Sequence, residues 1–145
     1  MMSTKEFLSN ITTRGGKTYH PTAMHLISAT NTMLQQRRRA ILPVFLTELY
    51  LNTNGLTLGN GCIFAPSEIA QGIRAPIPTI INVNDDLSSF EQIKGKTIFG
   101  RNDLFWFAYD AFGNCYMLDN IGLRPLRKYS DGQHAIIDCL MGGKL

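Results

Sequence analysis

The sequence predicts an α+β domain in which a central antiparallel sheet is flanked by helices at both ends of the chain. Apolar residues recur at helical spacing near both ends of the 145 residues, and short β-branched and aromatic segments lie between them. Seven of the 14 aromatic residues lie between Phe99 and Tyr116, which places the core of the sheet there. The length suits a single domain over 1–145, and 44% hydrophobic with 17% charged residues excludes a disordered chain.

Residues 1–41 predict a helical extension in front of the rest of the domain. Ser3 and Glu6 have the spacing of a capping box, which begins a short helix ending near Ile11. Residues 12–21 predict a loop because they contain two adjacent glycines. A second helix is predicted from about Thr22 and runs into the arginine cluster described below.

A third helix is predicted to begin at Pro43, because a proline at the first turn lacks only an N–H that would be unpaired there. Asn54-Gly55 is predicted to end it, with the glycine as left-handed cap. The next segments are predicted as a strand at Cys62–Phe64, a helical turn at Ser67–Ile69, an extended piece between Pro76 and Pro78, a strand at Thr79–Val83 and a loop at Asp85–Ser88.

The last third of the chain predicts the main part of the sheet. Strands are expected at Lys96–Phe99, Leu104–Tyr109 and Cys115–Leu118, with an edge strand at Leu123–Tyr129 that Pro125 interrupts. Asp110–Asn114 is predicted to be the loop of a hairpin. Ser130 or Asp131 caps a final helix, which Gly142-Gly143 ends. The residues expected to face inward on this helix are Ala135, Ile136, Cys139 and Leu140.

The net charge of +3 comes from the N-terminal part of the chain. Six basic residues and one acidic residue precede Pro43, whereas eight basic and ten acidic residues follow from there onward. Arg37–Arg39 has the charge of a nucleic-acid patch but lacks interleaved aromatic residues. We interpret it as a solvated helix end, where cations suit the negative end of the dipole, and expect no nucleic-acid partner.

We expect no catalytic residue, no metal and no cofactor. Gly15-Gly16-Lys17-Thr18 imitates the end of a phosphate-binding loop, but Ile11 stands where that loop needs its first glycine. The sequence contains no GxSxG motif and no CxxC pair. The groups that would have to converge on a zinc ion are far apart and lack ligand spacing: Cys62, Cys115, Cys139, His20, His25 and His134.

No run of 18 apolar residues is present, and the best one, Ala40–Leu46, contains Pro43. No apolar segment follows Lys5 near the beginning of the sequence, so no secretory signal is predicted. We therefore expect no membrane partner and a cytoplasmic location.

Acidic residues flank or precede the strands of the predicted hairpin: Asp85, Asp86, Asp103, Asp110 and Asp119. Paired carboxylates can serve hydrolysis or metal binding when burial separates their pKa values. Aspartate is also the usual residue at strand ends, because its side chain bonds nearby backbone amides. We favour this turn interpretation over a reaction centre.

Two parts of the sequence together suggest a family. Leu42-Pro43 begins a helix, Asn54-Gly55-Leu56 follows, and a glycine-bounded strand leads into Ile63–Ile69. The second part consists of Ile98–Asp103, Phe105–Asp110, the glycine turn at Gly113, and Cys115–Asp119. This succession resembles the SUKH superfamily of Smi/Knr-type domains over about Leu42 to Leu140.

The resemblance implies a sheet of about six strands and a non-enzymatic, protein-binding role. Most bacterial members look like immunity proteins that bind and neutralise a cognate polymorphic or contact-dependent toxin, and eukaryotic relatives act as scaffolds. Immunity proteins against nucleases are commonly acidic, so a chain of charge +3 would have to use an acidic face. We expect that face to be Asp85, Asp86, Asp103, Asp110 and Asp119. The alternatives are a scaffold or regulatory module of the same fold, and a carboxylate-based hydrolase or small-ligand binder.

Overall fold

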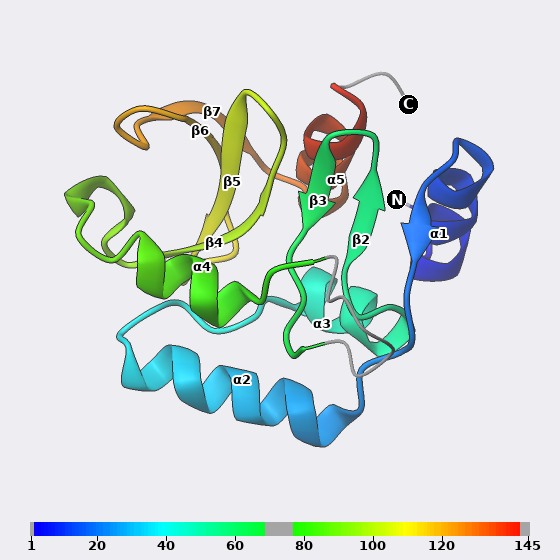
Figure 1. The fold of residues 1–145 in the computed structure, drawn as a ribbon, viewed down its shortest axis with the longest axis horizontal. Coiled ribbons are helices and arrows are strands. Elements are labelled where there is room, and N and C mark those ends of the chain that lie inside the picture. The colour runs from blue at the N-terminus through cyan, green and yellow to red at the C-terminus, as the bar shows by residue number, and fades with distance from the viewer. Residues whose placement is uncertain (1, 69–76, 143–145) are drawn as a thin grey trace.

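The computed structural model describes residues 2–68 and 77–142, and these residues form an α+β fold, as the sequence predicts. The elements along the chain are α1 (Thr4–Thr13), β1 (Lys17–Thr18), α2 (Met24–Gln36), α3 (Val44–Asn52), β2 (Leu56–Leu58), β3 (Gly61–Ile63), α4 (Ile80–Asp86), the 3₁₀ helix η1 (Glu91–Ile93), β4 (Lys96–Arg101), β5 (Phe105–Asp110), β6 (Cys115–Asp119), β7 (Pro125–Tyr129) and α5 (Gly132–Met141) (Figure 1).

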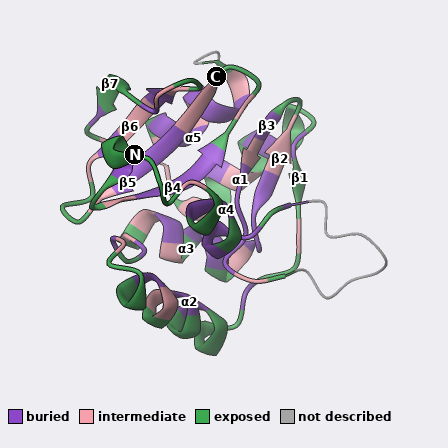
Figure 2. Cartoon of the chain, turned by 60° about the vertical axis from the view of Figure 1, so that its left-hand side comes forward, coloured by how far each residue is buried: buried purple, intermediate pink, exposed green. Residues whose placement is uncertain are grey.

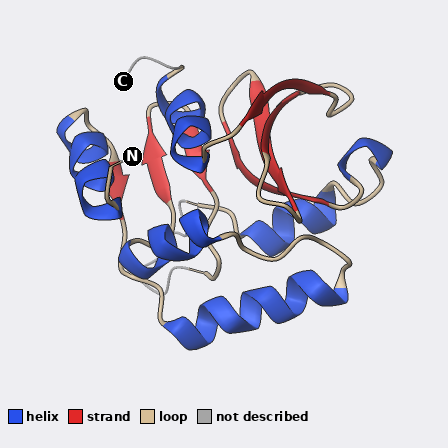
Figure 3. Cartoon of the chain, turned by 180° about the vertical axis from the view of Figure 1, so that it is seen from behind, coloured by secondary structure: helices blue, strands red, loops and turns tan. Residues whose placement is uncertain are grey.

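The described strands form one sheet in the order β1 to β7, and each strand is antiparallel to its neighbours. The meander from β4 to β7 and its hairpin are confirmed, and the strands of this part curl strongly (Figure 3). The sheet has seven strands within the described residues, slightly more than the expected number of about six. Two short strands were not predicted: β1, which lies inside the expected loop 12–21, and β2.

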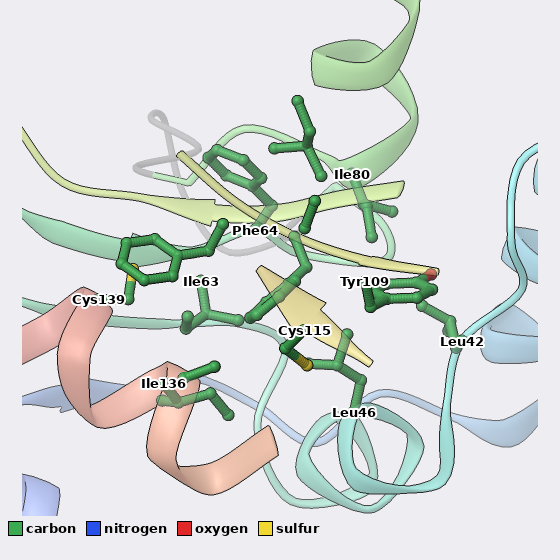
Figure 4. Packing of buried hydrophobic residues seen from close by; sticks show 14 of the residues in the cluster. Leu42, Leu46, Ile63, Phe64, Ile80, Tyr109, Cys115, Ile136 and Cys139 are labelled. Carbon is green, nitrogen blue, oxygen red and sulfur yellow. The ribbon is translucent and has the colours of Figure 1, made fainter. Parts of the chain in front are cut away.

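Helices cover the two faces of the sheet at different places. Figure 4 shows Ile136 and Cys139 of α5 on the side of Ile63, and Ile80 of α4 on the side of Phe64. All five of these side chains are buried in one hydrophobic cluster. Neighbouring residues of a strand point to opposite faces, so Ile63 and Phe64 reach different helices. The sheet is therefore a middle layer between α5 and α4.

The residues before position 42 belong to the same core as the rest of the chain. Phe7 and Ile11 of α1 and Ile27 and Leu34 of α2 are buried in the cluster that includes the sheet. The predicted cap at Ser3 is confirmed, because its side chain accepts the backbone N–H of Glu6 at 3.2 Å. Figure 2 shows the outer side of α2 exposed to solvent. This part therefore adds a packed layer and an edge strand.

The predicted strand at Thr79–Val83 is wrong, because these residues begin helix α4. The Thr79 side chain accepts the backbone N–H of Asn82 at 3.2 Å and so caps the helix. Ile80, Ile81 and Val83 are buried against the sheet in helical geometry. Their β-branched side chains lower helix propensity only slightly, and burial of an apolar face outweighs that preference.

The role predicted for Gly55 is also wrong. Helix α3 ends at Asn52, and the capping residue Thr53 is extended, with φ −155°. Gly55 has φ +101° and directs the chain into β2, where a Cβ would lie 3.0 Å from the carbonyl oxygen of Ile63. The predicted helical turn at Ser67–Ile69 and the extended piece that begins at Pro76 lie partly outside the described residues, as does the second glycine of Gly142-Gly143.

Candidate functional site

A cleft of about 660 Å³ lies where the β4–β5 turn, β6, β7 and α5 meet. Its wall is apolar at Leu104, Phe105, Met117 and Leu140. The polar side chains that line it are Asn60, Asn102, Asp103, Arg127, His134 and Asp138. Met117 of β6 pairs with Phe107 of β5 on one side and with Arg127 of β7 on the other. These three residues therefore lie side by side across the three strands.

A buried carboxylate lies at the α5 side of the cleft. Asp138 accepts a hydrogen bond from the Tyr129 hydroxyl and one from Arg127 Nη1 at 2.9 Å. The Arg127 guanidinium also lies 4.9 Å from the centre of the Tyr129 ring. Burial, and then the contact with Asp138, raises the pKa of Tyr129 well above its ordinary value. Charge and hydrogen-bonding capacity are therefore matched within this group, which suits a structural role.

The cysteines of this region are poorly suited to nucleophilic chemistry. Burial raises the pKa of the Cys62 thiol to about 11 and that of Cys139 further still. Cys139 Sγ lies 3.4 Å from the carbonyl oxygen of Arg101, to which it donates. A thiol with such a pKa stays protonated near pH 7, and the thiolate is the reactive form. Among residues 2–68 and 77–142, no group of three or more His, Cys, Asp or Glu side chains is placed to hold a metal ion.

Three turns of the meander share one construction. In each, an Asn or Asp side chain accepts, at 2.9 Å, the backbone N–H of the residue two positions later. That later residue is a large apolar side chain held out into solvent. The pairs, with the exposed fraction of the second residue, are Asn102 with Leu104 (60%), Asp110 with Phe112 (89%) and Asp119 with Ile121 (87%).

The structure therefore confirms the turn interpretation for Asp110 and Asp119. Asp110 also accepts the Asn114 N–H at 3.0 Å and the Tyr116 hydroxyl at 2.9 Å. Asp119 lies across from Phe105, at the opposite end of the hairpin from Asp110. At about 3.3 Å per strand residue, these two carboxylates are roughly 17 Å apart along the strands.

The five aspartates predicted to contact a partner fall into two groups. Asp103 lies in the β4–β5 turn and Asp119 ends β6, so both are at the same end of the hairpin. Asp85 and Asp86 end α4. The Arg39 guanidinium donates both to the Asn84 carbonyl of this helix and to the Lys96 carbonyl at the beginning of β4.

Since Lys96 pairs with Asp110, the end of α4 lies at the Asp110 end of the meander. Asp103 lines the cleft described above and also a second one, which Arg101, Trp106 and Asn120 border. Neither cleft is lined by any of the other four carboxylates. Their contact with a partner stays a prediction, but they do not share one binding cleft.

The arginine cluster is largely used inside the molecule. Arg37 bonds Asp85 at 2.7 Å, and Arg39 donates to the carbonyl groups of Ile93 and Lys96 at 2.9 and 3.2 Å. Arg38 has φ +57° and ends the turn after α2. Two of the three cations thus fix the loop after α2 against α4, η1 and the beginning of β4, a role that the sequence alone did not indicate.

The sequence did not single out the Asp138 group either. One signal was available, because Asp138 lies among the inward residues Ile136, Cys139 and Leu140 of the last helix. A carboxylate within an apolar stripe needs a partner, and Arg127 and Tyr129 alternate onto one side of the preceding strand. That combination indicates a buried, compensated charge near the end of the chain.

We expect the β6–β7 turn to loosen in acid. The backbone N–H groups of Gly122 and Ile121 hold the pKa of the Asp119 carboxyl below its ordinary value, near 3.9. A lowered pKa in the folded state stabilises the fold above the unfolded-state pKa, and this contribution is lost as the pH falls through the folded-state value. A carboxyl ¹³C titration should give a midpoint below 3.9 for Asp119 in the folded chain. A midpoint at or above that value would contradict this.

Every helix within the described residues is too short or too polar to cross a lipid bilayer. Neither the protein-family models nor the curated proteins compared with this sequence match it. The conclusions about function below therefore rest on the geometry of the chain itself and on the resemblance of its motifs.

Proposed function

We propose that this chain is a non-enzymatic protein-binding domain that binds and neutralises a cognate bacterial toxin, the role that its resemblance to the SUKH superfamily implies. The observation that carries the proposal is a pair of turns at one end of the meander, the β4–β5 and β6–β7 turns, each fixed by a side-chain acceptor. They hold Leu104 and Ile121 out into solvent at the end of β5 and β6 where the β4–β5 turn lines the open cleft.

Large exposed apolar side chains in fixed turns suit protein recognition. A few residues carry most of the binding energy in a typical interface. Binding costs less when the anchors are already ordered, and a side-chain acceptor fixes the backbone of each turn here. Leu104 and Ile121 project from turns at the same end of the strands, so one partner surface of about 800 Å² can cover both.

Phe112 supplies a matched control on the same molecule. Its turn has the same construction and its side chain is at least as exposed, but it lies at the opposite end of β5 and β6. Turn tips at opposite ends of a hairpin point in opposite directions. A partner seated at the Leu104 end therefore does not reach Phe112.

The test is co-expression of the chain with a toxin domain encoded beside its gene, followed by titration calorimetry on the purified pair. The chain should lift the growth arrest that the toxin causes. Leu104→Ser with Ile121→Ser should weaken the complex about a hundredfold, since truncating two anchors costs about 2–4 kcal/mol. Phe112→Ser should bind as the unaltered chain does.

Two results would count against the proposal. One is a folded chain that neither binds nor protects against any toxin domain encoded beside it. The other is full protection by the folded Leu104→Ser, Ile121→Ser variant, because protection would then not depend on the turns that support the proposal.

A further inference from the structure

The polar side chains around the cleft differ in how much of their hydrogen-bonding capacity and charge is matched by neighbouring described residues. Asn102 Oδ1 accepts the N–H groups of Leu104 and Phe105 at 2.9 and 2.8 Å, and its Nδ2 donates to the Cys139 carbonyl at 3.1 Å. Asp138 is compensated by Arg127 and Tyr129, as described above. These groups hold the walls together and have little left to offer a ligand.

Asp103 differs from these groups, because its carboxylate is exposed at the rim and weakly bound. Its contact among the described residues is an amide nitrogen of Asn60 at 3.5 Å, the outer limit for a hydrogen bond. No lysine, arginine or histidine nitrogen of residues 2–68 and 77–142 lies within 4.0 Å of it. The charge of Arg127 is offset by Asp138 at 2.9 Å, so the cleft presents one uncompensated negative charge beside an apolar wall.

This combination fits a long side chain with an apolar stem and a cationic end. The stem would lie along Leu104, Phe105 and Met117, as the stems of lysine and arginine commonly do on apolar surfaces. A guanidinium fits better than an ammonium, because it is planar, binds a carboxylate through two parallel hydrogen bonds and stacks on aromatic rings such as that of Phe105.

We propose that the cleft receives an arginine side chain of the protein partner, with Asp103 as its counter-charge. This inference rests on the proposed protein-binding function and names the chemistry that the partner presents. It also gives one of the predicted acidic residues a defined role: Asp103 pairs with a cation of the partner, while Leu104 beside it provides an apolar anchor.

The test uses three small probes and the unaltered full chain. N-acetyl-arginine methylamide, its citrulline analogue and its lysine analogue are each titrated at pH 8. Backbone amide shifts are followed by NMR. The arginine probe should shift the amides from Asp103 to Phe105 together with those of Met117 and Leu140. The neutral citrulline probe should bind about fivefold more weakly, the equivalent of about 1 kcal/mol for an exposed ion pair.

Two variants connect these shifts to the carboxylate. Asp103→Asn should lower the affinity for the arginine probe to that for citrulline, since the turn itself is held by Asn102 and keeps its shape. Glu91→Gln removes the same charge from an exposed position in η1, outside the cleft, and should leave the affinity unchanged.

Equal shifts by arginine and citrulline, an undiminished affinity in Asp103→Asn, or tighter binding of the lysine probe would each overturn the assignment. So would the absence of shifts in the cleft at the highest probe concentration. A toxin complex that depends on Leu104 and Ile121 but not on Asp103 would refute the arginine site alone. A cleft that binds the arginine probe in a chain that protects against no toxin would refute the proposed function alone.

Discussion

Replacing Asn84 by alanine is expected to lower the free energy of unfolding by about 4 kcal/mol. Asn84 lies on α4 with 1% of its surface exposed. Its Nδ2 donates to the Ile98 carbonyl at 2.9 Å, and its Oδ1 accepts the Ile98 N–H at 2.8 Å. Alanine would leave both backbone groups of a fully buried strand residue without these partners, at about 1–3 kcal/mol each.

The position of Asn84 explains why this effect should be large. Strand β3 pairs with β4 at Gly100 and Arg101, and Phe64 just after β3 donates its N–H to the Phe99 carbonyl at 2.9 Å. Among the described residues, no strand pairs with this edge of β4 at Ile98. The Asn84 amide supplies there one donor and one acceptor, as a neighbouring backbone would. Helix α4 thus continues the hydrogen bonding of the sheet beyond the end of β3.

Chemical denaturation of two variants tests the prediction. Asn82→Ala is the matched control, because Asn82 is exposed on the same helix and the Thr79 cap uses its backbone N–H, which alanine keeps. This control should change the free energy of unfolding by less than about 0.5 kcal/mol. A loss below 1 kcal/mol in Asn84→Ala would mean that water or a backbone shift satisfies Ile98 instead.

The same helix shows where sequence patterns fail. Ile80, Ile81 and Val83 read alone favour a strand, because β-branched side chains fit a pleated surface. What makes them helical is non-local, since the apolar face they form is buried only when β4 lies beside it. Asn84, the residue that joins α4 to β4, looks like an ordinary polar residue near a loop in the sequence.

The meander was predictable for the opposite reason, because its signals are local. Alternating aromatic residues and the turn residues Asp110 and Gly113 determine a hairpin over fewer than 20 residues. The exposed anchors could be predicted only in part. The sequence places Asp110 and Asp119 at turns, but exposure of Phe112 and Ile121 depends on which side of each turn the core lies.

The cleft depends on contacts between segments far apart in the chain, which a pattern within one segment does not reveal. Gly61, Asn102 and Asp138 come from β3, the β4–β5 turn and α5. No local feature indicates why position 61 is a glycine. Gly61 lies inside a short strand, and its φ is not in the left-handed region that favours glycine. A glycine is needed there because it has no side chain, which lets the α5 backbone approach β3 closely.

Gly61→Ala is expected to destabilise the chain by about 3 kcal/mol, the upper part of the range for overpacking. A Cβ at this position would lie 2.6 Å from the Cys139 carbonyl oxygen and 2.7 Å from the Leu140 Cα. Both are backbone atoms of α5, so no side-chain rotation relieves the contact. Gly122→Ala is the control, because its nearest neighbours are flexible Arg124 atoms at 3.8 Å.

Gly61→Ala should change the cleft as well as the stability. A change in the cleft distinguishes a displacement of α5 from a loss of stability without displacement. Moving α5 away from β3 stretches the Asn102 Nδ2 bond to the Cys139 carbonyl, now 3.1 Å. That bond joins the β4–β5 turn to α5, so amide shifts at Leu104 and Phe105 should accompany the loss of stability. Loss of stability with unchanged shifts there would mean that β3 yields instead of α5, and the close approach of the two backbones would then not be what shapes the cleft.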